Sequence, residues 1–252
     1  MNKQEILALF DELFTDFQNI ESIFEKRPLL AHYTSISVAE KILKDEELWF
    51  SNPLFMNDLE EMRFGFLTGM SRFTENAELD SACRTVERAD IAIRSINHYF
   101  TTFEDEHAVN VYVFCLSEHT PQDNDGRLSM WRAYGGSGNG AALVFNTEPI
   151  NRSDESPLLF AKVQYASTEE RIQWIDDKIT QWCNIVAQHD IPDDKLYLAS
   201  YQMLCVFQLF ALTWKHHGFK EEEGWRVIYM PDRDRQRMLH DRFGYIIKPI
   251  VV

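Results

Sequence analysis

The sequence has little of what most readily identifies a function. Its few cysteines form no CxxC pair and lie far apart, at Cys83, Cys115, Cys183 and Cys205. This spacing indicates neither a disulfide framework nor a paired-cysteine zinc site, and it favours a reducing, cytoplasmic location. A Walker loop, a GxSxG elbow and an HExxH pair are all missing from the sequence. The commonest nucleotide-hydrolase, α/β-hydrolase and zinc-protease mechanisms are therefore not indicated.

Basic residues are also scarce. The chain has 25 Lys and Arg against 40 Asp and Glu, a formal net charge of -15. Because phosphate groups and anionic membranes are bound by clustered Lys and Arg, this balance argues against general nucleic-acid binding and membrane binding, although it allows a local basic pocket. No run of 18 apolar residues is present, and acids interrupt the apolar N-terminus. We therefore expect neither a membrane span nor a signal peptide.

Apolar residues, in contrast, make up 45% of the chain and aromatic residues 13%, which is enough for a full core. A spacing of 4-3-4-3-4 near the N-terminus predicts one amphipathic helix over residues 2–26. Its apolar stripe either docks on the same chain or pairs with a second copy, which gives a homodimer. The stripe consists of Ile6, Phe10, Leu13, Phe17, Ile20 and Phe24.

Periodicity and turn residues predict an α+β fold, with a mixed or mostly antiparallel central sheet and flanking helices. The run VNVYVFCLS at 109–117 is typical of a central, buried strand. The expected domains are an N-terminal helix, 1–27, and a single α+β domain, 28–252. The chain stops inside the apolar run GYIIKPIVV, which leaves open whether it continues past Val252. The other expected strands are 29–33, 48–51, 141–146, 158–165, 225–230 and 243–252, and the expected helices are 37–45, 59–73, 78–102, 168–189 and 193–213.

Three separated segments place polar side chains beside Trp, Tyr or Gly at the edges of apolar runs. They are His32-Tyr33-Thr34, the stretch SMWRAYGGSGNG from Ser129 to Gly140, and FKEEEGWR from Phe219 to Arg226. Strand ends of this kind are where binding sites are commonly built. The glycines follow Tyr134 rather than a strand and read GxGxG, so they are not the dinucleotide-binding fingerprint.

These segments resemble a known family when they are taken together. HYTS, LWFSNPLFMND, CLSE, SMWRAYGGSGNGAALVF, KVQY and FKEEEGWRVIY follow the order and approximate spacing of the bacterial domain of unknown function 2971 family, over about residues 29–250. Glu222 matches the first acidic position of the family's ending, whereas Gly224 stands where a second Glu is common. The layout is also similar to that of ADP-ribosyltransferases, in which a His, an aromatic residue and a Glu come from three separate strands.

The second resemblance implies an ADP-ribosyltransferase-like or NAD-cleaving effector of toxin or phage-defence systems, which modifies a protein or nucleic-acid target. NAD is then the substrate and no metal is needed. Cleavage of the nicotinamide bond passes through an oxocarbenium-like state that a carboxylate stabilises. The implied catalytic residues are Glu222, His32 and Tyr134. The NAD-binding residues are Tyr33 or Tyr134 for stacking on nicotinamide, and Thr34 with His32 for the adenosine ribose. Gly138 allows close backbone approach, and Arg132, Lys215 and Arg226 are expected to bind the pyrophosphate.

Plainer interpretations and two other functions remain open. His32 fits a satisfied core histidine, Glu222 fits a structural pair with Arg226, and the glycines fit a tight turn. A non-catalytic sensor that binds a nucleotide or a protein is the first alternative function. A metal-dependent nuclease is the second, with Asp58, Glu222 and His32 or His216 as ligands.

Overall fold

The computed structural model describes residues 1–18, 23–53, 56, 59–102, 111–151, 156–231 and 234. Two compact units share the chain, and each is assembled from three segments. The helical unit consists of Met1–Asn19, Asp58–Val109 and Ala166–His216, and the sheet unit consists of Ile20–Asn57, Asn110–Tyr165 and His217–Val252. Long-range packing within each unit joins segments that local sequence patterns do not connect.

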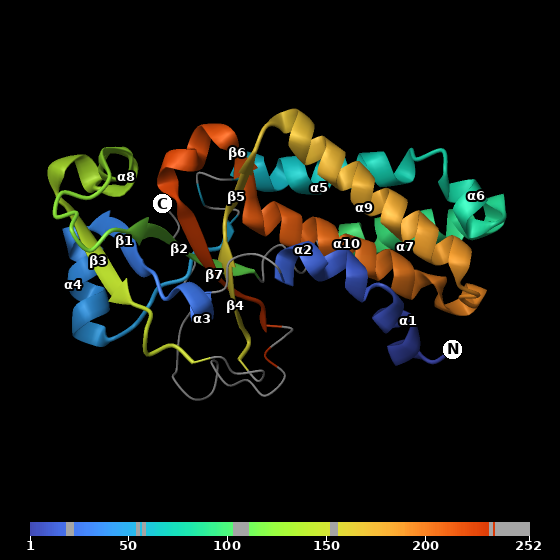
Figure 1. The fold of residues 1–252 in the computed structure, drawn as a ribbon, viewed down its shortest axis with the longest axis horizontal. Helices are drawn as coiled ribbons and strands as arrows, with labels where there is room; N and C mark the ends of the chain where they lie inside the picture. Colours follow the sequence, from blue (N-terminus) through green and yellow to red (C-terminus); the bar gives the residue numbers. More distant parts are fainter. Residues whose placement is uncertain are drawn as a thin grey trace. The chain divides into compact units, whose positions relative to one another are not determined.

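In the helical unit, α10 (Leu196–Thr213) is the core helix and packs against α1, α5, α7 and α9. The segment Asp193–Thr213 is long and apolar enough to cross a membrane, with a mean hydropathy of 1.4 over an 18-residue window, but 67% of that window is buried inside the structure. A capping box between Ser167 and Glu170 starts α9. The elements of this unit are α1 (Lys3–Leu9), η1 (Asp11–Phe14), α2 (Thr15–Gln18), α5 (Leu59–Thr74), α6 (Leu79–Cys83), α7 (Val86–Thr102), α9 (Thr168–Gln188), η6 (Asp193–Lys195), α10 and β6 (Trp214–His216) (Figure 1).

The prediction of one continuous helix over residues 2–26 is wrong. The first helix ends at Phe10, the chain tightens into the 3-10 turn η1, and α2 follows. Three residues of the apolar stripe are nevertheless packed within their own chain, since Phe10 and Leu13 are completely buried and Phe17 packs edge-on against Trp174 of α9. Ile20 of the stripe lies outside the described residues. A 3-10 turn changes the backbone pitch only slightly, so the spacing of the stripe did not reveal the break.

The sheet unit contains, among the described residues, a five-stranded sheet in the order β3-β1-β2-β7-β4, with every neighbouring pair antiparallel. The predicted α+β class and the central position of the strand near 109–117 are confirmed. The elements are α3 (Ile23–Lys26), β1 (Leu29–Ser35), α4 (Ile36–Asp45), β2 (Tyr112–His119), α8 (Leu128–Tyr134), η5 (Gly136–Gly138), β3 (Gly140–Asn146), β4 (Leu158–Lys162), η7 (His217–Glu222) and β7 (Gly224–Tyr229), and β5 (Gln164–Ala166) follows β4.

Several predicted elements have different bounds in the structure. The strand at 48–51 is reduced to a single antiparallel bridge between Ser51 and Val113. The helix at 78–102 divides at Arg84, whose φ of +71° ends α6, and the strand at 158–165 divides at Val163 into β4 and β5. The predicted strand at 243–252 lies outside the described residues.

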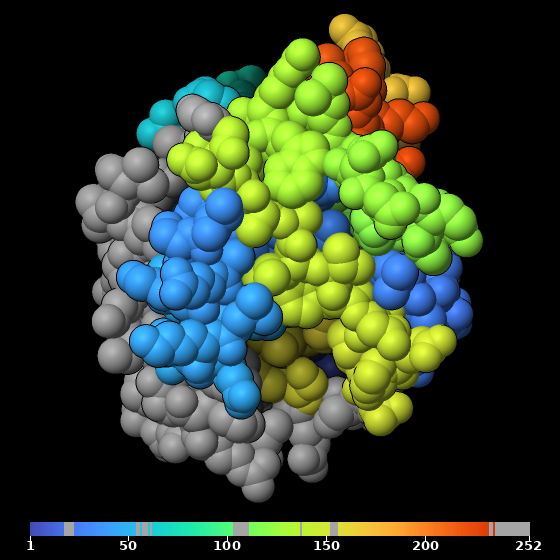
Figure 2. Space-filling view, turned by 90° about the vertical axis from the view of Figure 1, so that its left-hand side faces the viewer, coloured from blue at the N-terminus to red at the C-terminus, as the bar shows by residue number. Residues whose placement is uncertain are grey.

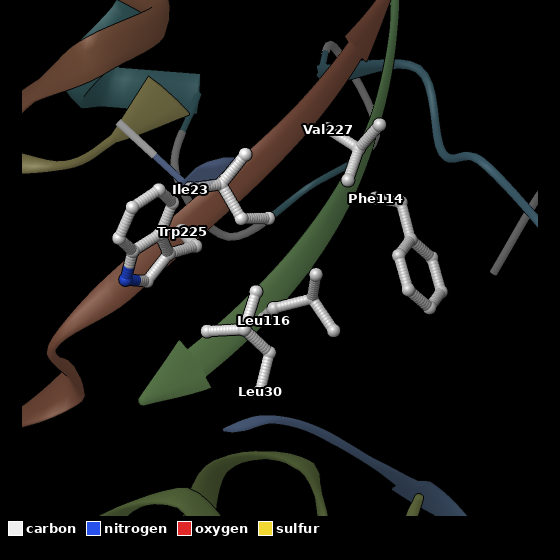
Figure 3. Packing of buried hydrophobic residues seen from close by; sticks show 6 residues of the cluster. All are labelled: Ile23, Leu30, Phe114, Leu116, Trp225 and Val227. Carbon is white, nitrogen blue, oxygen red and sulfur yellow. The ribbon is translucent and has the colours of Figure 1, made fainter. Parts of the chain in front are cut away.

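The sheet packs differently on its two faces. Because side chains alternate along a strand, neighbouring residues of β1 face opposite ways. The "Trp225 face" carries the larger apolar cluster, and Figure 3 shows its side chains, which come from α3, β1, β2 and β7. The "Tyr33 face" carries Ala31 and Tyr33, which α8 covers through Met130. The cluster on the Trp225 face consists of Ile23, Leu30, Phe114, Leu116, Trp225 and Val227.

Candidate functional site

The first strand of the sheet separates from its neighbour at His32. The pairing of β1 with β2 ends at Ala31, whereas its pairing with β3 continues through Ser35. Further along the same edge of β2, Ser51 takes the vacant place and exchanges two backbone hydrogen bonds with Val113, of 2.9 and 2.8 Å. The sheet therefore forks between these two pairings.

The imidazole of His32 occupies the fork. Its Nδ1 lies 2.9 Å from the backbone oxygen of Cys115, which faces the same edge of β2 as Val113 because the two residues are two positions apart. A carbonyl oxygen can only accept, so Nδ1 carries the proton and Nε2 keeps its lone pair. The ring also stacks on Phe114, with centroids 4.4 Å apart. A side chain thus replaces the backbone partner that β2 loses at the fork.

Burial lowers the pKa of His32 below its ordinary value of 6.5, and the hydrogen bond to the Cys115 oxygen opposes this shift. The ring is consequently neutral at pH 7, and Nε2 is suited to accept a hydrogen bond from a hydroxyl group. Thr34 projects from the same side of β1 as His32, because it follows two residues later. The two predicted ribose-binding side chains therefore share a face.

Tyr33 and Tyr134 lie on the opposite face of β1 from His32. Tyr33 is 5% exposed, its ring meets Trp131 edge-on at 4.9 Å, and its hydroxyl accepts the backbone N–H of Arg127 at 2.9 Å. Tyr134 ends α8 and packs on the cluster that contains Tyr33. The predicted catalytic pair of His32 and Tyr134 therefore does not share a face, and the Tyr33 ring is enclosed by α8 rather than open for stacking.

Close contacts within the turn between α8 and β3 explain two of its glycines. A Cβ on Gly140 would lie 2.6 Å from the Gly135 Cα, and one on Gly135 would lie 2.4 Å from the Trp131 oxygen. Gly138 differs, since its φ is +102° and an added Cβ would meet no atom within 4 Å. Figure 2 shows the segment around β3 at the surface, between α4 and α8. Close packing within the turn requires glycine at 135 and 140, whereas the backbone of Gly138 is open to approach.

Glu222 is half-buried at the end of η7, and one residue separates it from β7. The residue that follows, Glu223, has a φ of +40°, a left-handed conformation that non-glycine residues seldom adopt. Its N–H donates to the Lys220 oxygen at 3.2 Å and its own oxygen accepts the Glu118 N–H at 3.0 Å. The backbone around Glu222 is therefore held in a defined turn.

The three basic side chains that were predicted to bind the pyrophosphate have different surroundings. Arg132 is exposed on α8. Arg226 is 3% exposed within β7, opposite Cys115 in the register of β2. Lys215 is also 3% exposed, but it belongs to β6 of the helical unit. Of the two sheet-unit cations, only Arg132 is on the surface, where a ligand can reach it without rearrangement of the sheet.

Sequence reasoning missed two residues that organise this end of the sheet. The Oε1 atom of Glu118 receives the indole N–H of Trp225 at 3.1 Å and lies 3.2 Å from the Lys162 ammonium. Arg127, the N-cap of α8, reaches both β2 and η7 through its guanidinium. Glu118 stands in the quoted segment CLSE, which was a signal for it. Arg127 lies two residues before the second segment and carries no such signal.

Among the described residues, no group of three or more His, Cys, Asp and Glu side chains is arranged to hold a metal ion. Asp58, a ligand in the nuclease alternative, lies outside those residues. His216 belongs to β6 of the helical unit, whereas Glu222 belongs to the sheet unit.

Residues 130–227 match the model of a family described as "Protein of unknown function (DUF2971)". This match confirms the predicted family over that part of the chain, which includes Tyr134, Gly138, Glu222 and Arg226. Neither a curated protein nor a solved structure matches the chain.

Proposed function

We propose that the protein is an ADP-ribosyltransferase-like or NAD-cleaving enzyme, in which His32 and Thr34 bind a ribose of NAD. The fork at His32 is the observation that carries this proposal. A neutral imidazole with its Nδ1 proton committed to the Cys115 oxygen offers Nε2 to a sugar hydroxyl. The hydroxyl of Thr34, on the same side of β1, is a second group that can donate or accept.

In this proposal Glu222 is the carboxylate that acts on the nicotinamide ribose. The bond between C1′ and the nicotinamide nitrogen breaks, and both bonding electrons leave with nicotinamide, which neutralises its ring. A carboxylate stabilises the positive charge that develops on the ribose. A hydroxyl of the target or of water then forms the new bond to C1′ and loses its proton. Tyr33 and Tyr134 are not assigned to stacking, because α8 encloses that face.

A non-catalytic nucleotide sensor is the second candidate function. One specific observation favours it, namely that His32 and Tyr134, which comes from α8, lie on opposite faces of β1. A sensor needs a ribose-binding group but no converging catalytic set. Binding of NAD without its consumption distinguishes the sensor from the enzyme.

The test measures NAD consumption and NAD-dependent thermal stabilisation for the wild type, Glu222→Gln and His32→Asn. For an enzyme, Glu222→Gln keeps the shape but loses the charge, and turnover falls about a hundredfold at a nearly unchanged melting temperature. In His32→Asn an amide N–H replaces Nδ1–H toward Cys115 while the Nε2 position is lost, so NAD affinity falls about threefold to tenfold.

Glu60→Gln, which neutralises an exposed carboxylate of the helical unit, is the matched control and should behave as the wild type. If Glu222 is instead a structural partner of Arg226, its substitution lowers stability by about 1 to 3 kcal/mol and activity follows the folded fraction. A wild type that neither consumes NAD nor is stabilised by it would sink both the enzyme and the NAD sensor.

A further inference from the structure

Arg127 joins three parts of the sheet unit. Its Nη1 donates to the backbone oxygen of Glu221 at 2.8 Å, its Nη2 pairs with the Glu223 carboxylate, and its Nε donates to the backbone oxygen of Glu118 at 3.3 Å. Its backbone N–H donates to the Tyr33 hydroxyl at 2.9 Å. The Arg127 side chain is 26% exposed, so its position is set by these contacts more than by solvent.

Two of these contacts flank Glu222. The guanidinium holds the oxygen of the residue before it and the carboxylate of the residue after it. The residue after it, Glu223, is also the one in the left-handed conformation. Such a conformation persists only when its surroundings enforce it. The Arg127 guanidinium, with the Lys220 and Glu118 backbone groups, supplies that enforcement.

The contacts also explain why an arginine stands at this position. A guanidinium is planar and presents five donors in a fixed fork, so it can serve two carbonyl oxygens and one carboxylate together. A lysine ammonium carries its charge at one point and lacks the fork. Arg127 thereby connects Tyr33 of the first polar segment to Glu221 and Glu223 of the third.

From this geometry we propose that Arg127 is the positioning residue for Glu222, since it holds the backbone oxygen of the residue before that carboxylate and the side chain of the residue after it. The inference rests on the proposed function for its catalytic meaning, because Arg127 acts through Glu222 rather than on a substrate. The Tyr33 hydroxyl and the N-cap position of α8 hold the Arg127 backbone in turn.

The experiment compares the full-length wild type with Arg127→Ala, Arg127→Lys and Glu223→Gln. Hydrogen exchange of the segment 218–224 reports backbone order, and steady-state kinetics report kcat and KM for NAD. Arg127→Ala should speed exchange of that segment about tenfold or more. It should lower kcat about tenfold to a hundredfold, with KM changed less than about twofold. Arg127→Lys and Glu223→Gln should fall between the wild type and Arg127→Ala in both measurements.

Arg94→Ala removes an exposed arginine of α7 in the helical unit and should change neither measurement. If segment 218–224 exchanges as slowly in Arg127→Ala as in the wild type, or if exchange quickens while kcat stays unchanged, the inference is overturned. A wild type without NAD turnover contradicts the proposed function alone, and the exchange comparison then decides the positioning role by itself. If Arg127→Ala fails to fold, Arg127→Lys and Glu223→Gln supply the same comparison.

Discussion

His32 illustrates how one side chain can serve the sheet and, in the proposed function, also bind a ligand. Its Nδ1 donates to the Cys115 oxygen and its ring stacks on Phe114, so its position is fixed before any ligand binds. A ligand that uses Nε2 therefore bears little of the entropic cost of ordering the ring.

The lowered pKa of His32 predicts how acid affects stability. The folded pKa lies below the ordinary value of 6.5, so the unfolded chain binds more protons than the folded chain as the pH falls below about 6.5. The contribution of His32 to the free energy of unfolding is complete above that pH and is lost as the pH falls through the folded pKa. His32→Asn, which does not titrate, should show a flatter decline. Urea unfolding of both proteins from pH 8 to pH 5 measures this, and parallel curves would contradict it.

The sequence predicted which residues are distinctive better than it predicted their directions. His32 and Tyr33 are adjacent in a strand, so strand geometry alone places their side chains on opposite faces. The predicted strand therefore already implied that these two side chains do not share a face. Arg127 was not predictable, because most of its acceptors are backbone oxygens and the phenolic hydroxyl of Tyr33, which leave no pattern of paired charges in the sequence.

Among the elements, α5 and α10 approach unusually closely. A Cβ on Gly65 would lie 2.9 Å from the Ala211 Cα, and one on Gly69 would lie 2.7 Å from the ring of Phe207. Both neighbours belong to the fully buried core of α10, so they cannot move aside without disturbing it.

Gly65→Ala should therefore destabilise the protein, although alanine is the better helix former. Overpacking costs about 1 to 3 kcal/mol, whereas the gain in helix propensity is about 1 kcal/mol. Ser71→Ala, at an exposed position of the same helix, gives the propensity gain without the clash. Denaturant unfolding of the two variants should give changes of opposite sign, and stabilisation of both would refute the close contact.

Most strands and long helices were predictable because their apolar periodicity is local. The points at which predicted elements end or divide were not predictable, because each depends on one backbone conformation. Arg84 ends α6 at a φ of +71°, although nothing in its residue type requires this. The fork left Ser51 as a single bridge, which depends on where β1 departs from β2 rather than on the apolar character of residues 48–51.

For the whole molecule, the apolar N-terminal stripe determines which assembly is expected. Phe10 and Leu13 are completely covered within one chain, so these two residues of the stripe offer no surface to a second copy. Leu13→Ala should lower the unfolding free energy by about 2 to 5 kcal/mol without changing the mass of the particle. Light scattering on the folded wild type and variant tests this, and a halved mass in the variant would show that the stripe had joined two copies.

The division of the chain into interleaved segments has a consequence for its synthesis. The chain passes between the units at residues 19, 57, 109, 165 and 216, so neither unit is a contiguous stretch that a ribosome could complete and release early. The helical unit lacks α10 and β6 until residue 216 has been made, and the sheet unit lacks β7 until residue 229 has been made. Strands β1 and β2 must therefore wait for most of the polypeptide to be translated before the sheet is whole.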